Sequence, residues 1–284
     1  MKFILGIANF NSKYGLTNDL KKKDINNIIR SSLRHKIFEI DTANDYKISN
    51  KILKNLSSKS NFLINTKIPL IREKNYIKVI DQKISKFKKD IKHTHINTLF
   101  FHDRRQIFEK NIEKIINYVI YLKKNKIIKK YGFSVYNIGE LEEILSLSNP
   151  DVIQVPGNIF DNRFLNNKIL NLLKKKKIEI QVRSIFLQGT VLKRTYSLYD
   201  KKSEIILNRY WKTMDNFNYD VLDYNINFLK KFIKVDKFIL SFDDDKQLSS
   251  FFFSIKKKLN KSFRKINFNV DYKKLINPYL WKKK

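Results

Sequence analysis

Four side chains that can move or orient a proton lie at the ends of short apolar, β-branched runs of the sequence: Asp41, Tyr46, Lys67 and His102. A tyrosine has an unperturbed pKa of about 10, and a nearby ammonium lowers that pKa by stabilising the phenolate. A carboxylate would keep the ammonium charged and in place. A neutral histidine can donate a hydrogen bond to a carbonyl oxygen. The set therefore predicts proton donation to a carbonyl group during hydride transfer.

Each of these residues has an ordinary structural explanation when it is taken alone. Asp41 is a reasonable helix cap, Tyr46 a surface aromatic, Lys67 a solvated lysine and His102 a hydrogen-bonded residue at a strand end. Their occurrence in order at successive strand ends is the observation that favours a common site.

The elements that must position these residues follow from the apolar pattern. Amphipathic, lysine-rich stretches of helical period, such as 75–91 and 111–124, alternate with the short apolar runs. The predicted strands are 3–8, 37–42, 62–67, 98–102, 132–135, 152–155, 178–183 and 238–242.

Eight such units predict a single-domain α/β protein, a (β/α)8 TIM barrel that spans residues 1–284. A doubly wound parallel sheet is the alternative. Segment 190–235 is longer than one helix needs, so we expect it to hold a loop over the barrel mouth and the helix before the last strand. In a barrel, chemistry occurs where the strands end at the carboxyl face.

Composition excludes several classes. Lys plus Arg is 59 and Asp plus Glu is 27 in 284 residues, which gives a net charge of +32, and cysteine is absent. Thiol enzymes, zinc ribbons and disulfide-stapled modules are therefore excluded. The lysines are spread along the chain, so we expect no specific nucleic-acid partner, although DNA binding is a third alternative.

The lengths of the apolar runs and the spacing of the histidines bear on membrane and metal partners and on the cellular location. No run is long enough for a membrane span or a secretory signal, so the expected location is cytoplasmic, without a membrane partner. The pair His93 and His95 has no supporting carboxylate, so no metal is expected. The sequence does not indicate an oligomeric state.

Residues along nearly the whole chain resemble the aldo-keto reductase family, and its bacterial branch in particular. Asp41-Thr42-Ala43, followed by Tyr46 and Ser49, resembles the family motif D-T-A-x-x-Y-G-x-S-E, and Lys67 and His102 resemble the remaining two positions of its tetrad. The other similar segments are 9–15, 132–136, 154–161 and 182–189.

The resemblance implies a role for each tetrad residue. Tyr46 would be the general acid in reduction and the general base in oxidation, and Lys67 would tune its pKa. Asp41 would pair with Lys67, and His102 would orient the substrate carbonyl. The implied activity is the reduction of an aldehyde or ketone to an alcohol, and the bacterial branch favours sugar-derived carbonyl compounds.

The resemblance also implies a nicotinamide cofactor held in an extended form on the barrel. Ser134 and Gln154 would hold the carboxamide of the nicotinamide. Arg183 stands where the family commonly stacks an aromatic ring, and a planar guanidinium can also stack. Ser184 and Leu187 would cradle the diphosphate. NADPH is the implied cofactor, with NADH as the alternative.

The sequence departs from the family pattern at several positions. Lys47 and Asn50 replace the glycine and the glutamate of the motif, and Gly157 stands where an aromatic residue is common. The family usually has a glycine near Ser241, which is absent here. The cluster Asp243–Asp245 should repel a 2′-phosphate, although one of its residues could instead cap the following helix. A non-catalytic, regulatory or binding barrel is therefore the alternative function.

Overall fold

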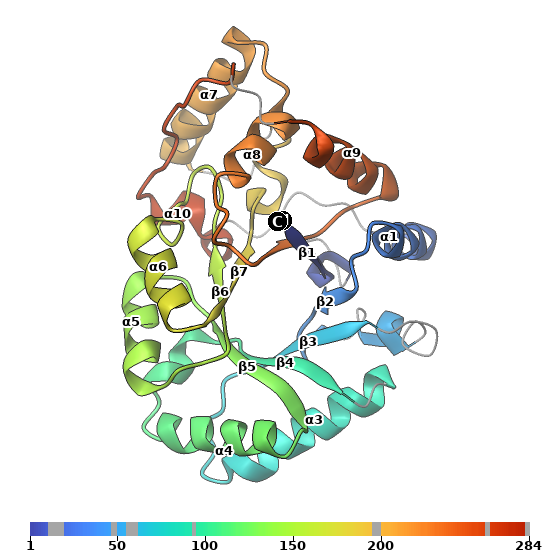
Figure 1. Cartoon of the computed structure of the whole chain (residues 1–284), viewed down its shortest axis with the longest axis vertical. Helices are drawn as coiled ribbons and strands as arrows, with labels where there is room; N and C mark the ends of the chain where they lie inside the picture. The colour runs from blue at the N-terminus through green and yellow to red at the C-terminus, as the bar shows by residue number, and fades with distance from the viewer. Residues whose placement is uncertain are drawn as a thin grey trace.

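A computed structural model describes residues 1–10, 20–46, 50–54, 62–92, 95–194, 200–258 and 262–281. Its eight parallel strands close into a barrel in sequence order, with helices around the outside (Figure 1). The strands are β1 (Lys2–Gly6), β2 (Glu39–Asp41), β3 (Leu63–Ile68), β4 (Ile96–Phe101), β5 (Ile128–Ser134), β6 (Val152–Pro156), β7 (Glu179–Arg183) and β8 (Lys237–Leu240). Positions 11–15 of the similar segment 9–15, and also Lys47, Ser49 and His93, lie outside the described residues.

The barrel confirms the predicted fold class and excludes the doubly wound sheet, because β1 pairs with β8. The largest difference is in β5, which begins at Ile128, ahead of the predicted start at 132. The start of this strand was not predicted, because Lys129 and Lys130 interrupt the apolar run that indicates a buried strand.

The helices pack their apolar faces on the barrel and turn lysines outward. Their bounds are α1 (Lys22–Arg34), α3 (Tyr76–Ile91), α4 (Ile112–Lys124), α5 (Ile138–Leu147), α6 (Asn167–Lys175), α7 (Lys201–Asn216), α8 (Val221–Leu229), α9 (Asp245–Lys256) and α10 (Lys273–Ile276). Short 3-10 turns are η1 (Ala8–Phe10), η2 (Arg104–Phe108), η3 (Leu187–Gly189) and η4 (Pro278–Leu280). No helix in the described part of the chain is long and apolar enough to cross a membrane.

The segment between β7 and β8 contains two helices, α7 and α8, where the sequence predicted one. Together with the chain after α9, they form a second core cluster outside the barrel wall, at the top of Figure 1. Tyr210 and Trp211 of α7, Tyr224 of α8 and Phe268 are buried in this cluster. The cluster fixes both α8 and the C-terminal tail beside the barrel mouth.

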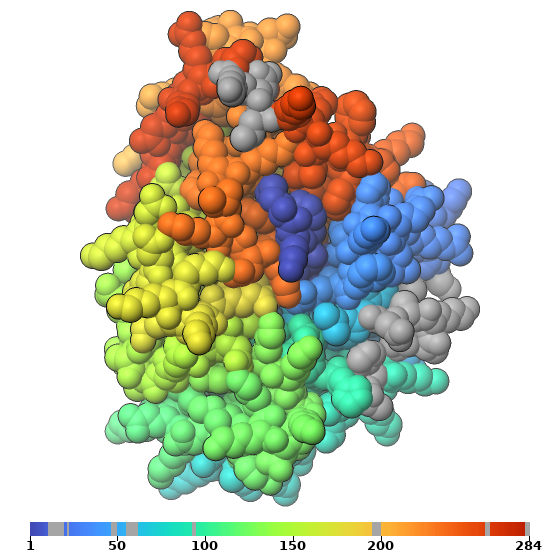
Figure 2. All heavy atoms as spheres, in the orientation of Figure 1, coloured from blue at the N-terminus to red at the C-terminus, as the bar shows by residue number. Residues whose placement is uncertain are grey.

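The first and last strands close the barrel. Lys2 aligns with Lys237 and Leu5 with Leu240. Figure 2 shows the N-terminal residues, in dark blue, between the lighter blue residues that follow them and the orange residues of the C-terminal third. A Cβ atom at Gly6 would lie only 2.9 Å from the Ser241 Oγ, so glycine permits the close approach of the two strand ends.

A chain of polar side chains runs through the barrel interior toward the carboxyl ends of the strands. Lys237 Nζ lies 3.0 Å from Glu179 Oε1, and Gln181 Nε2 donates to the same oxygen at 2.8 Å. Gln154 Nε2 donates to Gln181 Oε1 at 3.4 Å and to Asp41 Oδ1 at 3.0 Å. Burial opposes ionisation of Glu179, but the Gln181 bond and the neighbouring lysines lower its pKa to about 2. These contacts fix Gln154 and Asp41 from below.

Candidate active site

A cavity of about 750 Å³ opens at the carboxyl ends of the strands and extends to the start of α9. Asp41, Tyr46, Lys67 and His102 all line it. So do four of the five predicted cofactor residues, which are Ser134, Gln154, Arg183 and Ser184.

The loop that carries Tyr46 is held on both sides. The buried Asn50 side chain donates to the carbonyls of Ala43 and Asn44, at 3.2 and 3.3 Å. On the other side, Thr66 Oγ1 donates to Asn44 Oδ1 at 3.0 Å. Asn50, which departs from the family motif, thus anchors the loop that brings Tyr46 to the cavity.

Asp41 and Lys67 form a buried ion pair between β2 and β3. Lys67 Nζ lies 2.5 Å from Asp41 Oδ2 and also donates to the Thr42 carbonyl at 3.0 Å. The two side chains are 11% and 5% exposed. Burial lowers the pKa of Lys67 and the nearby Arg183 acts in the same direction, whereas Asp41 opposes both. A proton on Lys67 is therefore held mainly by its partner carboxylate.

His102 lies beside Tyr46, with the two rings edge-on and their centroids 6.4 Å apart. Burial lowers the pKa of His102 to about 4, and the cations of Lys67 and Arg183 act in the same direction. The carboxylate of Asp41 only partly opposes this shift. At neutral pH the imidazole is therefore uncharged and able to donate a hydrogen bond to a neutral acceptor.

The lowered pKa of His102 predicts a pH dependence of stability. The unfolded chain takes up this proton below pH of about 6.5, but the folded chain does so only near pH 4. Between these values the unfolded state binds more protons, so stability falls as the pH falls. Compared with His102→Gln, the wild type should lose up to about 3 kcal/mol more unfolding free energy between pH 7 and pH 4.

Urea unfolding of both proteins across this range measures the difference, because carboxylates that titrate in both proteins cancel. An equal pH dependence of the two proteins would show that folded His102 has an ordinary pKa.

The residues predicted to hold a nicotinamide lie together beside the tetrad. Ser134 ends β5 and Gln154 lies in β6, and both side chains are buried. Arg183 ends β7, where its guanidinium lies 4.2 Å from the ring centre of Tyr136 and donates to the Val135 carbonyl at 3.1 Å. Its buried Nε has no hydrogen-bond partner. This set offers a planar cation and amide and hydroxyl groups to a flat polar ring.

The loop after β7 has an unusual backbone. Ser184, Leu187, Gln188 and Gly189 all have positive φ, a conformation that is costly for residues with a side chain. This path turns the Leu187 side chain into the second core cluster, where it is fully buried. Gln188 and Gly189 line the cavity there, and Leu187 does not.

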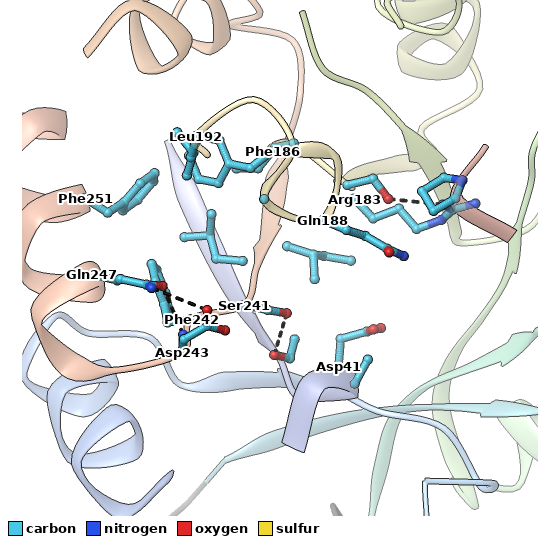
Figure 3. A pocket seen from close by; sticks show the side chains of 18 of the residues that line it. Asp41, Arg183, Phe186, Gln188, Leu192, Ser241, Phe242, Asp243, Gln247 and Phe251 are labelled. Carbon is cyan, nitrogen blue, oxygen red and sulfur yellow. Dashed lines mark hydrogen bonds between the residues drawn. The ribbon is translucent and has the colours of Figure 1, made fainter. Parts of the chain in front are cut away.

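The far end of the cavity is formed by β8 and the first turn of α9. Asp244 is the N-cap, whose side chain accepts from the Gln247 N–H at 2.7 Å, so one aspartate of the cluster does cap the helix. Asp243 also lines the cavity, and Lys193 Nζ lies 3.6 Å from its Oδ2. Figure 3 shows Asp243 and Gln247 at the end of the cavity opposite to Arg183.

A smaller lobe of about 290 Å³ adjoins the main cavity at His102, Tyr136 and Tyr279. Tyr279 comes from the C-terminal tail and packs edge-on against Tyr136, with centroids 5.4 Å apart. Asp45 and Arg104 supply opposite charges to the same lobe. No local sequence pattern indicates this lobe, because the position of Tyr279 depends on the packing of the tail.

The space beside Gly157 is filled by the chain itself. A Cβ atom there would lie 2.8 Å from Val182 Cγ1 and 3.0 Å from Leu165 Cδ1. An aromatic side chain, as is common in the family, would not fit without repacking these two residues.

A closed (β/α)8 barrel with polar side chains at the carboxyl ends of its strands is the architecture of TIM-barrel enzymes. Residues 2–262 match the aldo/keto reductase family, and the chain belongs to this family. Membership implies an oxidoreductase that acts on carbonyl compounds, as the family generally does with NADP(H).

Two similar solved structures come from bacteria. An aldo-keto reductase from Bacillus halodurans, in its holo form, has a TM-score of 0.72 and 15% identity, with 92% of this chain and 88% of that chain covered. The glycerol dehydrogenase from Gluconobacter oxydans has a TM-score of 0.67 and 15% identity, with 90% and 86% covered. At this identity the likeness supports the fold. No curated protein matches the sequence significantly.

Proposed function

We propose that this protein reduces an aldehyde or ketone to an alcohol at the expense of NAD(P)H, with Tyr46 as the general acid. The observation that carries the proposal is the buried Asp41–Lys67 ion pair, which lies in one cavity with Tyr46 and a neutral His102. Such a set can supply a proton to a carbonyl oxygen at neutral pH.

In this mechanism each residue has one task. His102 donates a hydrogen bond to the carbonyl oxygen and orients it toward Tyr46. A nicotinamide cofactor bound in this cavity would supply the hydride that the carbonyl carbon receives. Tyr46 gives its hydroxyl proton to the oxygen, and Lys67 stabilises the resulting phenolate. Asp41 and the Thr42 carbonyl keep the ammonium in place. In the oxidative direction the Tyr46 phenolate is the base.

The cofactor would lie along the main cavity, where Ser134 and Gln154 are available to its carboxamide. Arg183, which already stacks on Tyr136, would stack on the nicotinamide ring. Ser184, Gln188 and Gly189, which line the cavity, would border the diphosphate. The implied substrate is a small carbonyl compound, and the similar fold of a glycerol dehydrogenase favours one rich in hydroxyl groups, such as a sugar derivative. We place the reaction in the cytoplasm.

The test combines binding with hydride transfer. NADH and NADPH are each titrated into the protein, with the fluorescence of the reduced cofactor as the binding signal. A panel of sugar-derived and simple carbonyl compounds is then tested for turnover, which is measured as loss of absorbance of the reduced nicotinamide. A cofactor deuterated at the transferred position should deliver its label to the product carbon. If neither cofactor binds at millimolar concentration, the proposal of a nicotinamide-dependent enzyme is wrong.

A further inference from the structure

The main cavity ends in an environment that differs in charge from the rest of this basic protein. Asp243 and Asp244 line that end, and Asp245 begins α9. The other end of the same cavity holds Tyr46 and His102. A dinucleotide with its nicotinamide at Tyr46 would therefore place its adenosine half against α9. The apolar side chains of Leu192 and Phe251 lie near that end and suit a purine ring (Figure 3).

The N-terminus of a helix ordinarily binds phosphate through its unpaired N–H groups. In α9 one of these groups, the Gln247 N–H, is already bound by a side chain of the chain itself, and the N–H of the residue before the N-cap is bound as well. The Gln247 N–H donates to Asp244 Oδ1 at 2.7 Å, and the Asp243 N–H donates to Gln247 Oε1 at 3.0 Å. A phosphate that took the Gln247 N–H would have to displace the Asp244 carboxylate.

The charges at this end also disfavour a phosphate. Lys193 is the cation next to Asp243, at 3.6 Å, and its side chain is about half exposed. Lys246 also lines the cavity. A 2′-phosphate would share these lysines with two carboxylates and would be repelled by both of them. A ribose 2′-hydroxyl, in contrast, is uncharged and can donate a hydrogen bond to a carboxylate such as Asp243, so no repulsion between like charges arises.

We propose that Asp243 makes this cavity select NADH over NADPH, by accepting a hydrogen bond from the ribose 2′-hydroxyl and repelling a 2′-phosphate. This inference rests on the proposed function, since it requires a nicotinamide dinucleotide in the cavity. It assigns to the protein a cofactor preference opposite to the one implied by its sequence resemblance.

The experiment measures dissociation constants without turnover. NADH and NADPH are titrated into the wild type, Asp243→Asn and Asp245→Asn at one fixed ionic strength, with cofactor fluorescence as the signal. Asp245 carries the same charge but does not line the cavity, so it is the matched control. The wild type should bind NADH at least about 10-fold more tightly than NADPH, which corresponds to about 1.4 kcal/mol.

Asp243→Asn should reduce the ratio of the NADPH to the NADH dissociation constant below about threefold, mainly by strengthening the binding of NADPH. Asp245→Asn should leave this ratio unchanged. Equal or tighter binding of NADPH by the wild type overturns the proposal, and so does an equal effect of the two variants. Failure of both cofactors to bind is a different result, which rejects the proposed function itself.

Discussion

Tyr46→Phe is expected to lower kcat by about 10²–10⁴-fold, because it removes the proton that the carbonyl oxygen receives. The phenyl ring keeps its place beside His102, and the residues available to a cofactor are untouched. Cofactor dissociation constants should therefore change less than about twofold. Stopped-flow reduction of a carbonyl substrate, together with fluorescence titration of the cofactor, measures the two effects separately.

Tyr121→Phe provides the control for this prediction. Tyr121 is an exposed residue of α4 on the outside of the barrel, so the same loss of a hydroxyl there should leave kcat unchanged. If Tyr46→Phe retained more than about a tenth of the wild-type kcat, another group would be the acid, and the assignment of Tyr46 would be wrong.

Lys67→Met should damage both stability and turnover. The substitution leaves the Asp41 carboxylate buried without its cation, and removal of one partner of a buried pair costs about 3–5 kcal/mol. Turnover should fall as well, since no ammonium remains to stabilise the phenolate of Tyr46. Urea unfolding followed by circular dichroism gives the first quantity, and kcat of the folded fraction gives the second.

The double variant Asp41→Asn with Lys67→Met separates the two roles of Lys67. The Asn side chain at position 41 has no charge that needs a buried cation. Its amide oxygen can still accept the hydrogen bond that Gln154 donates to Asp41. Most of the lost stability should return, while turnover should stay low. Recovery of turnover in the double variant would show that Lys67 serves only to neutralise Asp41.

The barrel could be predicted from sequence because its strands are short, buried and apolar, and because they alternate with helical segments of regular period. The prediction was weakest where this contrast fades. At the start of β5, Lys129 is exposed and Lys130 pairs with Glu179 of the interior polar chain, so two charged residues interrupt the apolar run that would mark this strand. In segment 190–235 we predicted a loop and one helix, whereas the structure has two helices, α7 and α8.

The positions of Asp41, Lys67, Ser134 and Gln154 follow from the fold itself. They lie at or near strand ends, and parallel pairing in register brings strand ends together. The loop after β7 could not be predicted in this way, because Leu187 and Gln188 adopt positive φ without a glycine to signal it. The place of Tyr279 depends on how the tail packs on the second core cluster, which no local pattern encodes.

The pairing of Lys2 with Lys237 sets a condition on biosynthesis. The edge of β1 has no closing partner until β8 has been made, more than two hundred residues later. At synthesis rates of about 5–20 residues per second, roughly 10–50 s separate the two strands. During that interval the nascent chain exposes an unpaired, apolar strand edge, which is a template for misassembly. Closure of the barrel, and with it the joining of the β1 and β8 ends at the cavity, therefore waits until synthesis is nearly complete.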